Sequence, residues 1–217
     1  MDKTKCIAAL FDFDGVVMDT ETQYTIYWDE VGKKYHPELP HFGALIKGAT
    51  LTQIYDEYFS GMTAEQEEIT AGLNRFEREM KFEYIVGVVD FMKDLHTHGA
   101  KIAIVTSSNE LKMANVYAAH PELKEGLVDR ILTAEMFTRS KPAPDCFLLG
   151  ANVFKTVPEN CVVFEDSFHG LEAGNAAGMT VVGLSTTNSP EAIKDKCKLS
   201  ISDFSGFDYE KMIALLG

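Results

Sequence analysis

The chain has 217 residues, of which 46% are hydrophobic, and its 20 basic and 33 acidic side chains give a formal net charge of -13. This length suits one domain with an insertion, and the excess of acid argues against a protein that binds nucleic acid through a basic face. No apolar run approaches the roughly 20 residues that a membrane span needs, so we expect no membrane partner.

The first residues predict a buried strand and give no sign of export. Residues 6–11 (CIAALF) are apolar, while residues 1–6 lack the apolar core and the cleavage site of a leader. The four cysteines (Cys6, Cys146, Cys161 and Cys197) show no C-x-x-C spacing, and no histidines are spaced as zinc ligands. We therefore expect free thiols in a cytoplasmic protein.

A helical insert follows the first strand. Residues 17–84 show helical spacing and no convincing buried strand. The clearest helix lies within residues 63–84, where Ile69, Leu73 and Phe76 recur on one face. Thr63 and Gln66 predict a capping box at its start.

After the insert, short apolar runs alternate with helical patterns. The predicted strands are 101–105, 161–164 and 180–184, and the predicted helices are 88–98, 109–119, 144–154 and 168–178. Strands that are apolar throughout are typical of a parallel sheet with helices on both faces. The expected fold class is α/β with a parallel sheet.

Acidic residues follow two of these strands. Asp12 and Asp14 come directly after the first strand and face the same side, with Gly15 allowing a sharp turn. Taken alone, this pair has an alternative explanation as an acidic turn. Glu165 and Asp166 follow another strand, and ligands of parallel sheets sit at the carboxyl ends of the strands. Four converging carboxylates predict a hard divalent cation, Mg²⁺.

Groups suited to phosphate lie near the same edge. Thr106 and Ser107 end the second strand and offer hydroxyl and N–H groups. Lys141 lies in a loop that Pro142 and Pro144 fix, whereas most lysines are solvated surface charges. Together these residues indicate phosphoryl transfer, in which a carboxylate attacks phosphorus and Asp14 moves the proton.

Four segments, in order, resemble the motifs of the haloacid dehalogenase-like hydrolases. They are 11–16 (FDFDGV), 105–106 (VT), 140–142 (SKP) and 164–167 (FEDS), and they are most similar to the β-phosphoglucomutase-like branch of phosphatases. The resemblance spans residues 5–185. It implies a Rossmannoid catalytic core, residues 1–16 and 87–217, with an all-helical cap inserted at residues 17–86.

The resemblance also implies roles for single residues. Asp12 would be the nucleophile and Asp14 the acid and base, while Thr106 and Lys141 would bind the transferring phosphate. The residues implied at the border of the phosphate pocket are Ser107 and Asn109. The implied Mg²⁺ ligands are Asp12, the backbone carbonyl of Asp14, and Asp166, with Glu165 as a further ligand.

The cap departs from the sugar-phosphate mutase of this branch. Tyr24 stands where the mutase has a histidine, and Leu51 stands where it has an arginine that grips a second phosphate. Val86 replaces a frequent proline at the hinge. Lys47, beside the flexible Gly48, is a candidate substrate contact, with a solvated surface charge as its alternative.

We therefore expect a monomeric, Mg²⁺-dependent phosphatase for a small phosphorylated metabolite, a sugar phosphate, working through an aspartyl-phosphate. One alternative is a mutase of the β-phosphoglucomutase type. Another is a phospho-acceptor signalling domain, although such domains are shorter and carry their acceptor later in the chain. A non-catalytic binding protein on the same fold is a third, and the presence of both Asp12 and Asp14 speaks against it.

Overall fold

The computed structural model of the chain describes residues 6–47 and 49–216. Residues 1–5, where no leader is predicted, and Gly48 of the Lys47-Gly48 pair lie outside the described residues. In the described ranges no helix is both long and apolar enough to cross a membrane. The cysteines are all free, as the sequence predicts.

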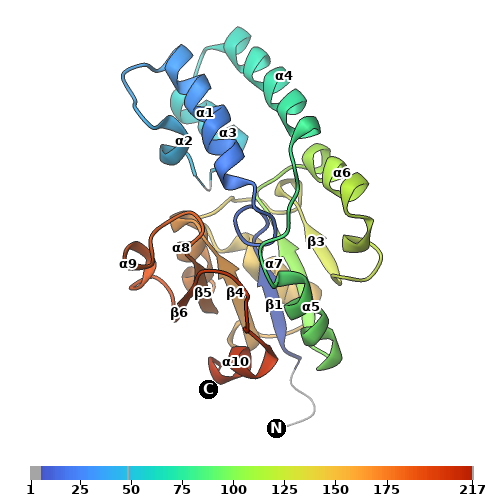
Figure 1. Cartoon of the computed structure of the whole chain (residues 1–217). Coiled ribbons are helices and arrows are strands. Elements are labelled where there is room, and N and C mark those ends of the chain that lie inside the picture. The colour runs from blue at the N-terminus through green and yellow to red at the C-terminus, as the bar shows by residue number, and fades with distance from the viewer. Residues whose placement is uncertain (1–5, 48, 217) are drawn as a thin grey trace.

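A six-stranded parallel sheet forms the centre of the fold, with strand order β3-β2-β1-β4-β5-β6 (Figure 1). The strands are β1 (Ala8–Phe11), β2 (Lys101–Val105), β3 (Arg130–Leu132), β4 (Cys161–Glu165), β5 (Thr180–Leu184) and β6 (Leu199–Ile201). The chain moves outward from β1 to β3 and then returns to the other side of β1 with β4. The switch point between β1 and β4 is where open sheets of this kind bind ligands.

Helices cover both faces of the sheet, which explains why its central strands are apolar throughout. Alternate residues of β1 point to opposite faces: Phe11 belongs to one buried cluster and Leu10 to the other. One face packs on α5 (Val88–Thr97), α6 (Glu110–Ala119) and α10 (Tyr209–Ala214). The other packs on α7 (Asp145–Val153), α8 (Phe168–Ala176) and α9 (Pro190–Ile193). The expected α/β class with a parallel sheet is confirmed.

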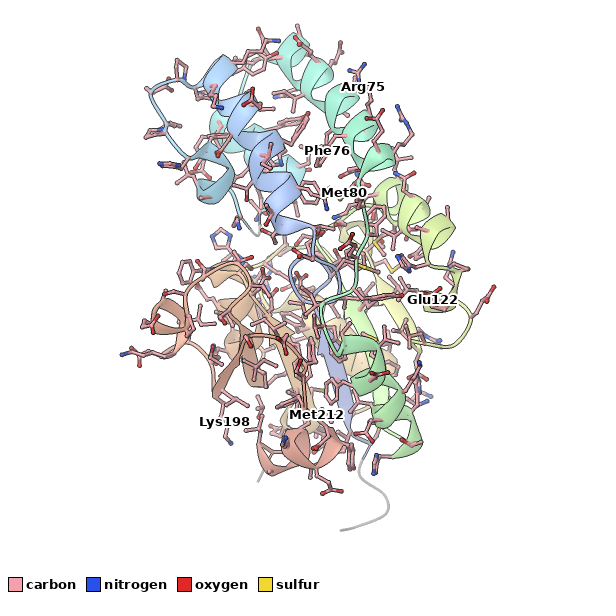
Figure 2. All side chains as sticks on the ribbon, in the orientation of Figure 1. Arg75, Phe76, Met80, Glu122, Lys198 and Met212 are labelled. Carbon is pink, nitrogen blue, oxygen red and sulfur yellow. The ribbon has the colours of Figure 1, made fainter. Side chains whose placement is uncertain are left out.

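The segment between β1 and α5 folds into helices that lie over the carboxyl end of the sheet, at the top of Figure 1. They are α1 (Glu21–Tyr35), α2 (Phe42–Leu45), α3 (Leu51–Tyr58) and α4 (Thr63–Glu79). These helices, hereafter the cap, have a hydrophobic core of their own built around Trp28, Phe42 and Phe59. Phe76 of α4 points toward α1 and stacks on Tyr27 (Figure 2). The boundaries at residues 17 and 86 stay a prediction.

The predicted capping box at Thr63 is wrong. Thr63 is the first residue of α4, Met62 is the N-cap, and the side chain of Gln66 donates to the backbone carbonyl of Phe59 instead. A capping box with the same spacing forms at α3, where Thr50 and Gln53 bond each other reciprocally. The strands β3 and β6 were not predicted, because each is a three-residue strand at an edge of the sheet.

Candidate active site

The ends of β1 and β4 bring the two predicted acidic segments together. The strands are parallel neighbours with Phe11 opposite Phe164, and the backbone N–H of Asp12 donates to the carbonyl of Phe164 at 2.9 Å. Carboxylate oxygens of Asp12, Glu165 and Asp166 all lie within 4.8 Å of one another. The side chain of Phe13 is buried, as the alternation of the strand predicts.

Lys141 lies between two of these acids. Its Nζ is 2.6 Å from Asp12 Oδ1 and 2.6 Å from Glu165 Oε1, and the residue is only 2% exposed. The solvated alternative for this lysine is therefore wrong. The Lys141 backbone carbonyl also accepts a hydrogen bond from Gln53 of the cap at 3.1 Å. The loop that carries Lys141 thus touches both the acidic cluster and the cap.

The second oxygen of Glu165 is held by the start of α8. Its Oε2 accepts from the backbone N–H groups of Asp166 and Ser167 at 2.9 and 3.0 Å, and from the Ser167 hydroxyl at 3.1 Å. A Cβ at Gly170 would lie 1.7 Å from Glu165 Oε1, so a glycine lets the helix approach this closely. Glu165 therefore anchors Lys141, and its predicted role as a metal ligand stays a prediction.

The buried acids carry more negative charge than Lys141 balances. Burial, opposed by Lys141, raises the pKa of Asp12 from 3.8 to about 7. Burial, together with Glu21 and Glu165, raises the pKa of Asp166 well above its usual value. Oxygen donors with excess negative charge suit a hard divalent cation. Asp12 and Asp166 therefore fit the predicted Mg²⁺ site, and Asp166 is held by hydrogen bonds from Thr187 to its carboxylate and from Asn188 to its carbonyl.

Asp14 has partners that the sequence did not predict. Its Oδ1 accepts from the Thr20 hydroxyl, and its Oδ2 accepts from the Ser108 hydroxyl at 3.0 Å. Lys112 of α6 donates to both oxygens at 2.6 Å and is itself only 2% exposed. One signal for Lys112 was available: it occupies the first turn of a helix, where a positive charge opposes the helix dipole.

The turn after β2 presents polar groups between the acids and α6. Ser107, Ser108 and Asn109 line the cavity described below. The Ser107 hydroxyl is buried with no hydrogen-bond partner among the described residues. Thr106, by contrast, is buried outside the lining and its hydroxyl accepts the Ser108 N–H at 3.0 Å. Its predicted phosphate contact stays a prediction.

A cavity of about 480 Å³ opens above the acids and beneath the cap. The cap residues that line it include Tyr24, Trp28, Ile46, Leu51, Tyr55 and Leu73. Lys47 also lines the cavity, and its Nζ is 3.2 Å from a carboxylate oxygen of Glu21. Tyr24 donates to Glu77 at 2.8 Å, and burial raises the pKa of the Tyr24 hydroxyl well above its usual value. The upper wall is thus mainly aromatic and aliphatic, with the acids Glu21 and Glu77 and with Lys47, which is paired with Glu21.

The structure brings together most of the residues predicted from the sequence. The predicted residues that line the cavity are Asp12, Asp14, Lys47, Ser107, Asn109, Lys141 and Asp166. Asn109 also caps α6, since its side chain accepts the Lys112 N–H. Glu165 and Thr106 lie behind this surface and hold its parts in place.

Comparisons with known proteins agree with this geometry. The sequence model of a family described as "Haloacid dehalogenase-like hydrolase" matches residues 9–184. The chain is 28% identical over 215 residues to "Protein SUPPRESSOR OF QUENCHING 1, chloroplastic" of Arabidopsis thaliana, covering 94% of this chain but only 20% of that protein. It is 30% identical to "Fructose-1-phosphate phosphatase YqaB" of Escherichia coli (strain K12), covering 80% of this chain and 93% of the relative.

The fold itself has solved counterparts. A crystal structure of β-phosphoglucomutase from Clostridium difficile superposes with a TM-score of 0.73, covering 97% of each chain at 22% sequence identity. At that identity the likeness concerns the fold, and the chemistry has to be argued from the side chains of this chain.

Proposed function

This chain belongs to the haloacid dehalogenase-like hydrolases, and we propose that it is a Mg²⁺-dependent phosphatase that hydrolyses the monophosphate of a small metabolite, a sugar phosphate. The observation that carries the proposal is the acidic cluster of Asp12, Glu165 and Asp166 at the floor of a capped cavity, with Lys141 paired to Asp12 and Glu165 and with Asp14 beside it. A signalling domain that passes phosphate to a partner protein needs no such enclosed cavity for a small molecule.

Asp12 is the proposed nucleophile. Lys141 fixes its Oδ1, while its Oδ2 accepts no hydrogen bond from any residue in the described part of the chain. A carboxylate oxygen of Asp12 attacks phosphorus, the bond from phosphorus to the ester oxygen breaks, and Asp14 gives a proton to the departing oxygen. The product of this first step is an alcohol and an aspartyl-phosphate on Asp12.

The second step returns the enzyme to its starting state. Asp14 takes a proton from water as the water oxygen attacks phosphorus, and the bond from Asp12 to phosphorus breaks to release inorganic phosphate. Lys141, which lies beside Asp12, and the unpartnered Ser107 hydroxyl are the proposed partners of the phosphoryl oxygens. Asp12, Asp166 and the carbonyl of Asp14 would hold Mg²⁺, which supplies positive charge to the transferring group when bound.

The lining of the cavity favours hydrolysis over isomerisation. A mutase must hold a second phosphate, which calls for a cation in the cap. Of the described residues that line the cavity, the cations are Lys47, Lys112 and Lys141. Each is already paired with a carboxylate, and Leu51 lies in the wall where the mutase has arginine. These pairs support a substrate with one phosphate and an uncharged remainder.

A sugar suits the remainder of the cavity. Aromatic side chains such as Tyr24, Trp28 and Tyr55 offer flat surfaces, and the acid Glu77 offers an acceptor for hydroxyl groups. The relative from Escherichia coli is named for fructose 1-phosphate, which makes that ester the first probe. The test is a screen of sugar and polyol monophosphates with Mg²⁺, reading released phosphate, with Asp12→Asn as the control. A wild-type protein that releases no phosphate from any of them would overturn the proposal.

A further inference from the structure

Lys112 is the buried cation that the proposed reaction does not yet use. It lies in α6 of the core, is 2% exposed, and makes three polar contacts through Nζ. Two go to the oxygens of Asp14 at 2.6 Å and the third to the Ser108 hydroxyl oxygen at 2.9 Å. A lysine that is chelated in this way has little freedom to move, so it is a fixed part of the site.

Lys112 and two hydroxyl groups occupy the acceptor positions of Asp14 in this structure, so Asp14 takes up a proton only where one of the hydroxyls turns away from it. A carboxylate has about four acceptor positions. On Oδ1 they are taken by Thr20 and Lys112, and on Oδ2 by Ser108 and Lys112. The Thr20 and Ser108 hydroxyls turn about single bonds and can exchange Asp14 for another partner. Lys112, which bonds both oxygens at once, is the contact that fixes the plane of the carboxylate.

The cap closes over Lys112 from the other side. Its Nζ lies 4.4 Å from the centre of the Tyr24 ring in α1, an arrangement typical of a cation–π interaction. The Tyr24 hydroxyl is in turn bonded to Glu77 of α4 at 2.8 Å. Asp14, Lys112, Tyr24 and Glu77 therefore form a continuous chain of contacts from the floor of the cavity to both long helices of the cap.

We propose that Lys112 is a positioning residue that holds Asp14 in one orientation for proton transfer, and that Tyr24 of the cap holds Lys112 in place. The inference rests on the proposed phosphatase activity. Among the described residues the Lys112 ammonium donates to Asp14 and Ser108 and not to the nucleophile Asp12, so its proposed action is through Asp14. The cap contributes to this placement, because the Tyr24 ring of α1 lies against the ammonium group of Lys112.

The leaving group separates this role from a structural one. The alkoxide of fructose 1-phosphate needs a proton as it departs, whereas p-nitrophenolate leaves readily without one. Lys112→Met should slow the burst of alcohol release from fructose 1-phosphate by about 10²-fold, the cost of misplacing a catalytic group. The burst from p-nitrophenyl phosphate should stay within about tenfold of the wild type. Tyr24→Leu should show the same selective loss to a smaller degree, compared at saturating substrate so that its contact with the sugar does not enter.

Two further variants complete the test. Lys124→Met is a matched control, because Lys124 also lies over a tyrosine ring, that of Tyr117, but outside the cavity. It should leave both bursts unchanged. In an Asp14→Asn background, Lys112→Met should have no further effect on the fructose 1-phosphate burst, because the group it positions is gone. This double variant also removes the carboxylate that would otherwise be left without its partner, so it remains informative if Lys112→Met folds poorly.

The outcomes are separable. Three outcomes would overturn the role of Lys112 while leaving the proposed phosphatase activity intact. Lys112→Met could slow the bursts from both substrates equally, it could slow neither, or its loss could add to that of Asp14→Asn in the double variant. If the wild type hydrolyses neither ester, the proposed function fails. Amide hydrogen exchange then tests the contact between Lys112 and Asp14 without any activity. Residues 13–20, which carry Asp14, should exchange faster in Lys112→Met than in Lys124→Met. Equal exchange would show that Lys112 does not hold this segment.

Discussion

Replacing the nucleophile should make the metal-free protein more stable while it abolishes turnover. Burial dominates the electrostatics of Asp12 and raises its pKa from 3.8 to about 7 in spite of the contact with Lys141. Above pH 7 the Asp12 carboxylate of the folded protein is therefore ionised in surroundings that favour its protonated form. The difference in pKa corresponds to an upper limit of about 4 kcal/mol of destabilisation. Asp12→Asn removes that charge with almost no change in shape.

The sign of the pH dependence follows from the raised pKa. The folded form binds the Asp12 proton more tightly than the unfolded chain does. The contribution of Asp12 to the free energy of unfolding is therefore greatest at low pH, and it falls as the pH rises from 3.8 toward about 7. In EDTA, Asp12→Asn should therefore unfold at a higher temperature than the wild type at pH 8, and the gain should shrink by pH 5. Its steady-state release of phosphate should fall by at least about 10³-fold.

Thermal unfolding at both pH values, followed by circular dichroism, measures this gain. Asp19→Asn is the matched control, because it replaces a carboxylate by an amide in the same way but at an exposed position in the same segment. A lower unfolding temperature for Asp12→Asn at pH 8, or a gain of equal size at pH 5, would refute the claim that burial of this charge costs stability. Retained turnover would remove Asp12 as the nucleophile.

The remaining predictions concern the metal and the outcome of the reaction. Asp166→Asn should raise the Mg²⁺ concentration for half-maximal phosphate release by about tenfold or more, because one charged oxygen donor is lost. An unchanged Mg²⁺ titration would show that Asp166 is not a metal ligand. Full wild-type activity after exhaustive chelation would show that the reaction needs no metal. With β-glucose 1-phosphate, Mg²⁺ and a trace of the bisphosphate, phosphorus NMR should show inorganic phosphate accumulating faster than glucose 6-phosphate, because Leu51 offers no grip for a second phosphate; the opposite order would identify a mutase.

Much of the fold could be predicted because the sheet is buried on both faces. A strand such as β2 has no polar face to obscure its apolar run, and its bounds, Lys101–Val105, agree with the prediction. The three-residue strands β3 and β6 lie at the edges, where a strand is short and half exposed, so they carry no comparable signal. The capping box was misplaced because Thr63 and Thr50 share the same local spacing, and tertiary contacts of Gln66 and Gln53 decide between them.

The site could be predicted as far as its residues follow strands directly. Asp12 and Asp166 come straight after β1 and β4, so sequence position alone places them at one edge of the sheet. Lys141 was found because two prolines mark its loop. The partners of these residues could not be predicted from sequence position. Glu165 anchors Lys141 because Gly170 lets α8 come close to the Glu165 carboxylate, and such a distance is set by packing.

Several residues of the candidate site violate local rules of stability. Lys112 places a positive charge in the first turn of α6, against the helix dipole, and is buried besides. Asp12 and Asp166 are buried acids whose pKa values burial raises, and Ser107 is a buried hydroxyl without a partner among the described residues. Each choice would cost stability in a protein selected only to fold. All four positions line one cavity, and this convergence is what a binding or catalytic requirement produces and a folding requirement does not.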